Sequence, residues 1–355
     1  MELIPGLPDD VGRDCLIRVP YDHFSSASSV CRRWKAEIQH PDFFRSRKSA
    51  GCARSIVVMA QARVDPAEVP SSLKHLASPA YRLTLCDPGI GSWHELPAVP
   101  GFAGLLPMFC RIVGVGSDLV VMGGWDPTTW EVSNAVFIYN FVSTSWRRGA
   151  DMPGRRRSFF GCASDSRRAV FVAGGHDEEK NALRSALAYD VPNDEWTPLP
   201  DMECQRDECK GLFRGGKFHV IGGYTTEMQG RFERSAEAFD VTTWHWYPPQ
   251  ADLLEANVCP RTCVDGSGGK LYMCLKEHVA VFDKSKGQEV AELPADVCRI
   301  ACTSSWEGRL LVIGSARIGG PHSAYILDLK DYKWTSVTAP VEYSGHVQSA
   351  CCLEI

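Results

Sequence analysis

The sequence predicts a small all-α segment followed by an all-β propeller of six blades. Three observations predict this fold: a unit of about 43 to 53 residues recurs from residue 52 onward, the composition suits short strands, and helical spacing is confined to the residues before the first unit. The 355 residues include 31 Gly, 22 Pro and 10 Trp, which is typical of many short strands joined by turns. Each such unit forms a four-stranded sheet that is stable only when it packs against its neighbours.

Two marks define the repeated unit. The first is an apolar run that ends in a Gly pair, where positive φ allows a tight strand exit. The second is an aromatic residue seven positions before a Trp, which we expect to pack between blades. The clearest copies carry Gly pairs at 123–124, 174–175 and 222–223, and the aromatic pairs Tyr139/Trp146, Tyr189/Trp196 and Phe239/Trp246.

Three further units are degenerate. The first begins at 55–61 and continues to Trp93, the fifth has Glu289 at the Trp position, and the sixth runs from 310 to Trp334. The first unit lacks the strand that precedes the Gly pair elsewhere, whereas residues 348–355 form a strand with no place in the sixth unit. We therefore expect the C-terminal strand to complete the first blade and close the ring.

Charge and hydropathy narrow the function class. A formal net charge of −5 with 23% charged residues argues against a polybasic nucleic-acid binder and against an acidic tail. No apolar run approaches the roughly 18 residues of a membrane span, and the N-terminus lacks the basic and apolar regions of a signal peptide. We expect a soluble, non-secreted protein of the cytoplasm and/or nucleus.

The fifteen cysteines are odd in number and contain no C-x-x-C pair, so they do not form a zinc-ligand pattern. The closest spacings are Cys204/Cys209, Cys259/Cys263, Cys298/Cys302 and the adjacent pair Cys351-Cys352. Most cysteines lie in strand-like apolar runs, where Cys packs as a small hydrophobic residue. We expect buried free thiols in a reducing compartment, with metal binding or redox sensing as the alternative.

The N-terminal segment has helical spacing. A helix opens at 7–10, with Pro near its start and acidic residues in its first turn. Gly12 costs about 1 kcal/mol inside this helix, so we expect a partner to stabilise it. Between Pro20 and Pro41, apolar residues recur at three- and four-residue steps and predict one apolar helix face. These residues are Phe24, Ala27, Val30 or Cys31, Trp34 and Ile38.

This segment resembles the F-box. The matching residues are Leu7, Pro8, Asp9, Asp10, Cys15, Leu16, Arg18, Val19, Pro20, Phe24, the run 30–35, Ile38, Pro41 and Phe43. The resemblance implies that residues 1–48 bind a Skp-type adaptor, which links to a cullin and a RING subunit. The adaptor-binding residues that it implies are Leu7, Pro8, Asp9, Cys15, Leu16, Val19, Pro20, Val30 and Trp34. A purely structural helical cap on the propeller is the alternative.

The repeated unit resembles the kelch repeat, which implies a six-bladed kelch β-propeller over residues 52–355. Together the two resemblances identify the chain as a member of the plant F-box/kelch-repeat proteins. Such a protein is implied to be the substrate-recognition subunit of an SCF-type (Skp–cullin–F-box) E3 ubiquitin ligase, which marks a protein substrate for proteasomal degradation.

Five stretches resemble more closely the plant group that targets phenylalanine ammonia-lyase. They are 1–10, 61–66, 157–165, 174–180 and 206–210. This resemblance implies phenylalanine ammonia-lyase as the substrate and negative regulation of phenylpropanoid metabolism. Type-B cytokinin response regulators are the alternative substrate, because members of the group are also linked to their degradation.

Strand alternation predicts which face of the propeller binds the substrate. In an antiparallel four-stranded blade, the loop after each Gly pair and the loops that join blades lie on the same rim. Trp125, His176 and Tyr224 follow the three Gly pairs, and an 18-residue insertion at 63–80 extends the same rim.

Arginine recurs in the loops that join the blades. The arginines of this set are Arg111, Arg156, Arg157, Arg206, Arg261 and Arg299. Arg and aromatic residues dominate interface hot spots, so both sets are predicted to bind a substrate with an acidic or mixed segment. The alternative is that these arginines pair with local acids such as Asp207 and only brace the loops.

Two common enzyme motifs are absent from the sequence. The chain contains neither a G-x-S-x-G nor a P-loop pattern, and the run 266–269 lies at a turn between strands. The acidic run after His176 resembles a metal-ligand cluster, but adjacent residues on a turn seldom converge on one ion. We therefore expect a non-catalytic receptor without cofactor or metal. A kelch-fold oxidase or other enzyme and a non-degradative scaffold are the alternatives.

Overall fold

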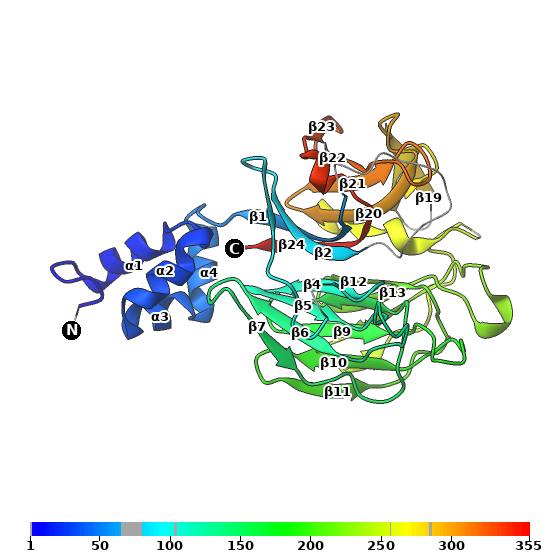
Figure 1. Cartoon of the computed structure of the whole chain (residues 1–355). Coiled ribbons are helices and arrows are strands. Elements are labelled where there is room, and N and C mark those ends of the chain that lie inside the picture. Colours follow the sequence, from blue (N-terminus) through cyan, green and yellow to red (C-terminus); the bar gives the residue numbers. More distant parts are fainter. Residues whose placement is uncertain (1, 65–79, 103–104, 256, 284–285) are drawn as a thin grey trace.

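The computed structural model places a helical segment against one side of a β-propeller (Figure 1). It describes residues 2–64, 80–102, 105–255, 257–283 and 286–355. The helices are α1 (Asp9–Ile17), α2 (Phe24–Val30), α3 (Arg32–Ile38) and α4 (Pro41–Ser49), with a 3₁₀ turn at Tyr21–His23. No helix of the described ranges is long and apolar enough to cross a membrane.

The prediction of one continuous helix face between Pro20 and Pro41 is wrong, because the chain breaks at Cys31. This residue is extended, with φ −161° and ψ 165°, and separates α2 from α3. Its thiol accepts a hydrogen bond from the Trp34 backbone N–H at 3.5 Å and so caps α3. As a result Val30 is turned to solvent and is 61% exposed.

A glycine is needed at position 12 of α1 for steric reasons, which helix propensity alone does not predict. A Cβ at this position would lie 3.3 Å from the Cβ of Leu3, so glycine lets the N-terminal residues pack across α1. Leu3 is buried there. The expectation that an external partner compensates for Gly12 is therefore unnecessary, since packing within the segment accounts for it.

The helical segment is joined to the propeller through a buried arginine and a shared core. The Arg47 guanidinium donates hydrogen bonds to the backbone carbonyls of Ile17, Val19 and Cys52, and lies 4.8 Å from the centre of the Phe24 ring. The apolar cluster that contains Phe24 continues without interruption into the first two blades. The orientation of the helices relative to the propeller is thus fixed by packing.

The propeller consists of six four-stranded antiparallel sheets, which confirms the predicted fold class. Along the chain the strands are β1 (Ser55–Ala62), β2 (Tyr81–Asp87), β3 (Ser92–Glu95), β4 (Arg111–Val115), β5 (Asp118–Met122), β6 (Val136–Asn140), β7 (Ser145–Gly149), β8 (Gly161–Ser164), β9 (Ala169–Ala173), β10 (Ala186–Asp190), β11 (Glu195–Leu199), β12 (Lys210–Arg214), β13 (Lys217–Ile221), β14 (Ala236–Asp240), β15 (His245–Trp246), β16 (Val264–Asp265), β17 (Leu271–Leu275), β18 (His278–Asp283), β19 (Lys286–Glu292), β20 (Arg299–Trp306), β21 (Arg309–Ser315), β22 (Ser323–Asp328), β23 (Trp334–Val337) and β24 (Val347–Glu354).

The first blade combines the two ends of the propeller, in the strand order β24-β1-β2-β3. The register pairs Ser55 with Glu354 and Val58 with Cys351. Just beyond β24, Ile355 exchanges two backbone hydrogen bonds with Arg54, at 2.7 and 2.9 Å, and is fully buried. The C-terminus therefore lies beside the helical segment (Figure 1).

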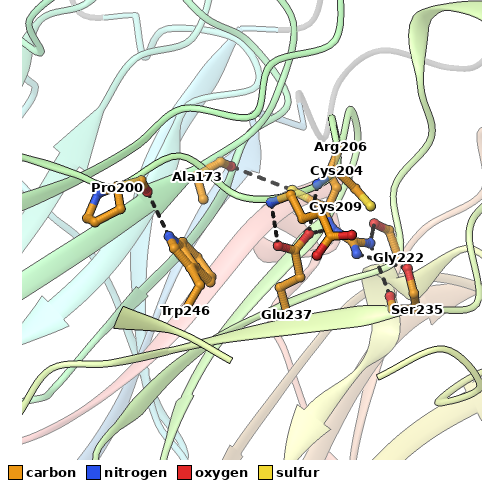
Figure 2. Close-up of polar contacts among 10 residues, drawn as sticks. Ala173, Pro200, Cys204, Arg206, Cys209, Gly222, Ser235, Glu237 and Trp246 are labelled. Atoms are coloured by element: carbon orange, nitrogen blue, oxygen red, sulfur yellow. Dashed lines mark hydrogen bonds and ion pairs between the residues drawn. The ribbon is translucent and has the colours of Figure 1, made fainter. Parts of the chain in front are cut away.

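The repeated tryptophans link neighbouring blades. Each lies on an outermost strand, and its indole N–H donates to a backbone carbonyl of the preceding blade at 2.7–3.0 Å. The donor and acceptor pairs are Trp93–Thr338, Trp146–Pro97, Trp196–Ala150, Trp246–Pro200 and Trp334–Glu292. One of them, Trp246–Pro200, is drawn in Figure 2. The Trp position is thus a hydrogen-bonded contact between blades as well as an apolar one.

Candidate functional site

The Gly pairs bring two sets of loops together on one rim of the propeller, as strand alternation predicts. Gly174 and Gly175 have φ of +66° and +80°, and a Cβ on Gly175 would lie 2.3 Å from the carbonyl oxygen of Ser158. This close approach allows each residue after a Gly pair to pair with a residue of a blade-joining loop. The bridges formed are Met108–Trp125, Ser158–His176 and Asp207–Tyr224.

These bridges build an open cavity of about 300 Å³, here called the rim pocket. Its lining residues are Phe109, Trp125, Trp130, Phe159, His176, Lys180, Asp207, Glu208, Tyr224 and Gln229. The structure therefore brings together Trp125, His176 and Tyr224, the three residues predicted after the Gly pairs. Phe109, Trp130 and Phe159 were not predicted for this site.

Hydrogen bonds hold the polar side chains of the rim pocket in place. His176 Nδ1 lies 2.9 Å from the Asp207 carboxylate, and the Tyr224 hydroxyl donates to Glu208 at 3.0 Å. The Trp125 indole N–H donates to the Ser158 hydroxyl at 3.2 Å. Burial and the two neighbouring carboxylates raise the pKa of Tyr224, so its hydroxyl stays protonated and remains a donor.

The backbone around the rim pocket is strained at equivalent positions of three blades. Phe109, Phe159 and Glu208 each lie two residues before an innermost strand, and their φ values are 57°, 53° and 51°. Non-glycine residues rarely adopt this conformation, and such strain concentrates at functional sites. It aligns a row of rings, with centroids 5.2 Å apart for Phe109 and Phe159 and 5.5 Å apart for Phe159 and His176.

Two of the predicted substrate-binding arginines are buried, so that part of the prediction is wrong. Arg157 donates to the carbonyls of Gly174 and Ser185, and Arg206 makes the equivalent bonds to Gly222 and Ser235. These guanidinium groups satisfy the carbonyls of Gly174 and Gly222, the first residues of two of the three Gly pairs, and they cannot reach a partner.

Arg206 also forms a fully buried ion pair with Glu237, with 3.0 Å between Nε and Oε1 and both side chains 0% exposed (Figure 2). The backbone N–H groups of Glu203 and Cys204 donate to the same carboxylate at 2.7 and 3.2 Å. The network fixes the loop that carries Asp207 and Glu208 to the rim pocket.

The remaining predicted arginines are not gathered into one ring. Arg156 is exposed and lies 3.7 Å from Glu178, while Arg299 is exposed and does not line the rim pocket. Arg111 and Arg261 line the central channel instead. Of the insertion at 63–80, which was predicted to extend the rim, residues 65–79 lie outside the described residues.

The residues predicted to bind the adaptor occupy the helical segment with different exposures. Pro8, Asp9, Cys15, Pro20 and Val30 are exposed, whereas Leu7, Val19 and Trp34 are half-buried. Leu16 is only 1% exposed and belongs to the helical core, so it is not free to contact an adaptor and that prediction is wrong.

The exposed edge of α1 is held by the residues around it. Asp9 accepts a hydrogen bond from the Leu3 N–H at 2.6 Å, and the Trp34 indole donates to the Leu3 carbonyl at 2.8 Å. Val11, which the motif did not single out, is 42% exposed on the same helix. An exposed apolar side chain on a helix of this small segment offers area to a partner.

Metal ligands do not cluster in the part of the chain that the structure describes: no group of three or more His, Cys, Asp or Glu is arranged to hold an ion. The acidic residue after His176 is already occupied, since Asp177 accepts hydrogen bonds from Arg155 at 2.7 Å and from the Asn181 N–H at 2.9 Å. All fifteen cysteines are free thiols.

Comparison with known proteins agrees with both parts of the structure. The F-box domain model matches residues 4–46, and the Kelch motif model matches 108–153 and 156–203. The Arabidopsis thaliana F-box/kelch-repeat proteins At1g15670 and At1g80440 are each 49% identical to this chain over 100% of both chains. The solved structure of YjhT has a TM-score of 0.58 at 16% identity, covering 74% of this chain and 93% of that one, and so shows the propeller fold.

The combination of an F-box and kelch repeats in one chain implies a substrate receptor of an SCF complex. In such a receptor the F-box binds a Skp-type adaptor and the propeller binds a protein substrate. Proteins built in this way are generally non-catalytic. On the full-length similarity and the two matched domains, the chain belongs to the plant F-box/kelch-repeat family.

Proposed function

We propose that the substrate is phenylalanine ammonia-lyase, bound at the rim pocket and presented for ubiquitination and proteasomal degradation, so that the chain lowers phenylpropanoid synthesis. One observation carries the proposal. Three of the five stretches that resemble the group targeting this enzyme, 157–165, 174–180 and 206–210, contribute residues to the rim pocket: Phe159, His176, Lys180, Asp207 and Glu208. Half of the ten residues that line the candidate site therefore come from stretches that carry the resemblance.

The rim pocket has the chemistry of an interface anchor site. Exposed aromatic rings such as Phe109 and Trp130 provide rigid apolar area, and the fixed carboxylates and Lys180 select the polar groups around it. The ubiquitin carrier and the RING subunit carry out the transfer of ubiquitin to the substrate. The receptor raises the effective concentration of substrate near them, in the cytoplasm or nucleus.

The test is ubiquitination of purified phenylalanine ammonia-lyase by the chain assembled with adaptor, cullin, RING subunit and ubiquitin carrier. We expect the double variant Phe109→Ala/Trp130→Ala to lower the initial rate by about tenfold or more, because truncating aromatic anchors removes about 2 kcal/mol or more of binding energy. Both side chains are 44–52% exposed, so folding is preserved.

The matched control is Trp244→Ala, which removes a ring that is 42% exposed on the β14–β15 turn, away from the rim pocket. Its rate is expected to equal that of the unmodified chain. Equal rates for the rim variant and the unmodified chain would rule out the rim pocket. If a type-B cytokinin response regulator is ubiquitinated and the ammonia-lyase is not, the response regulator is the substrate and the proposal is wrong.

A further inference from the structure

A second cavity runs along the axis of the propeller. The strands β4, β8, β12, β16, β20 and β24 contact one another in a ring and enclose a channel of about 700 Å³. Phe109, Phe159 and Glu208 line both this channel and the rim pocket, so one end of the channel opens beside the rim pocket. We call this end the channel mouth.

Three cations from three different blades line the channel mouth. Arg111 and Lys210 are the first residues of β4 and β12, and Arg261 lies on the short turn Pro260–Thr262 just before β16. Because the innermost strands all start on the rim side, these three positions face the same opening. We propose that the channel mouth binds a small polyvalent anion that carries carboxylate or phosphate groups, held by Arg111, Lys210 and Arg261.

The three cations lack a counter-charge. Among the residues that the structure describes, no Asp or Glu lies within ion-pair distance of any of them. Arg111 donates through Nε to the Phe160 carbonyl at 3.0 Å, and Arg261 donates to the Ile300 carbonyl at 3.1 Å. These single bonds position the guanidinium groups and leave their other N–H donors for a ligand.

The carboxylate nearest to the channel mouth does not neutralise them. Glu208 is bound by the Tyr224 hydroxyl and supplies one negative charge against three positive ones. Asp265 and Glu307 also line the channel, but both lie toward its opposite end. Asp265 is 3.8 Å from Arg214, the last residue of β12, and Glu307 follows the last residue of β20. The mouth therefore carries a net positive charge.

The thiols of the channel wall do not supply negative charge either. Cys162 and Cys302 line the channel near these cations, and burial raises the pKa of both thiols, that of Cys162 to about 11. They are neutral at physiological pH. Burial lowers the pKa of Lys210, as does the positive charge of Arg111, which is the signature of a cation that lacks a partner.

Cavity size and charge together define the ligand class. About 700 Å³ lies within the range of cavities that enclose small molecules. Guanidinium and ammonium groups that converge from several directions suit an ion with several negative oxygens, since each cation then bonds a separate oxygen. The site goes beyond the proposed function, because neither adaptor nor protein substrate is needed to fill it.

The test is the thermal unfolding midpoint of the purified full chain with citrate or with pyrophosphate, each compared with sodium chloride at the same ionic strength. We expect at least one of the two anions to raise the midpoint by a few degrees beyond the chloride control. Citrate alone indicates a carboxylate ligand and pyrophosphate alone a phosphate ligand. No anion-specific increase for either would overturn the proposal.

Lys210→Met is the sharpest variant, because it shortens the side chain by only one atom, removes the charge and breaks no hydrogen bond that the structure records. We expect its ligand-free midpoint to equal or exceed that of the unmodified chain, and its dissociation constant for the anion, measured by calorimetry, to rise about tenfold or more.

The matched control is Arg309→Met, which removes a cation from the opposite end of the same channel and should leave the anion affinity unchanged. Arg261→Gln, at an exposed position, repeats the test should Lys210→Met fail to fold. Equal anion affinity in the mouth variants and the unmodified chain would contradict the assignment. Because the assay contains no protein substrate, its outcome is independent of the ubiquitination test.

Discussion

Deletion of residues 346–355 is expected to leave a chain that does not fold. The deletion removes β24, which supplies the innermost strand of the first blade and hydrogen-bonds along β1 from Ser55 to Gln61. Val347 and Ile355 are fully buried and Leu353 is nearly so. Burial of three such side chains contributes about 5 to 9 kcal/mol, which is comparable to the entire stability of a typical domain.

The measurement is circular dichroism with limited proteolysis of the truncated and complete chains. We expect loss of the β-sheet signal and rapid digestion after truncation. The matched control is Glu354→Ala, which breaks only the surface ion pair with Lys48 and should change stability by less than about 1 kcal/mol. An unchanged unfolding midpoint in the truncated chain would refute closure of the ring by β24.

Glu237→Ala is expected to lower the free energy of unfolding by about 3–5 kcal/mol, because it leaves the buried Arg206 guanidinium without a counter-charge. The backbone N–H groups of Glu203 and Cys204 lose their acceptor at the same time. Glu237→Gln keeps an acceptor oxygen and should cost less than the Ala variant.

Denaturant unfolding provides the comparison, with Arg184→Ala as the control. That substitution breaks an exposed pair with Asp201 at 3.1 Å and should change stability by less than about 1 kcal/mol. A loss below 1 kcal/mol for Glu237→Ala would show that the buried pair does not hold the loop. The expected loss links stability to the site, because the same loop carries Asp207 and Glu208.

The parts of the fold that local chemistry determines could be predicted from the sequence. The Gly pairs need positive φ, and the Trp positions recur because each blade meets the previous one in the same way. These two marks predicted six blades and the rim on which Trp125, His176 and Tyr224 lie. The helix break at Cys31 could not be predicted, because the apolar spacing continues across it without a Gly or Pro.

The roles of the arginines depended on register, which the sequence alone did not resolve. Arg157 and Arg206 lie four residues before the strand-start positions occupied by Gly161 and Lys210. The earlier position is buried against the Gly-pair carbonyls, while the later one faces the channel. Lys210 and Arg111 are both the first residue of an innermost strand, and aligning them would have distinguished these channel-facing positions from Arg157 and Arg206. The burial of Arg157 and Arg206 was not predictable, because it results from contacts between loops that are distant in sequence.

The aromatic residues of the rim pocket were missed for a similar reason. Phe109 and Phe159 lie at equivalent positions, two residues before an innermost strand, and this recurrence was a usable signal. Their placement in the rim pocket was not predictable, because it depends on a positive φ that neither residue type favours. Trp130 lies at the tip of a loop outside the repeat marks.

The helical segment and the rim pocket are two separate surfaces, and we expect them to bind adaptor and substrate independently. The most direct measurement is capture of adaptor and phenylalanine ammonia-lyase by three forms of the chain: unmodified, Leu7→Ala/Pro8→Ala, and Phe109→Ala/Trp130→Ala. We expect Leu7→Ala/Pro8→Ala to lose the adaptor and keep the substrate, and Phe109→Ala/Trp130→Ala to keep the adaptor and lose the substrate. Loss of both partners in either folded variant, or of neither in both, would contradict this expectation.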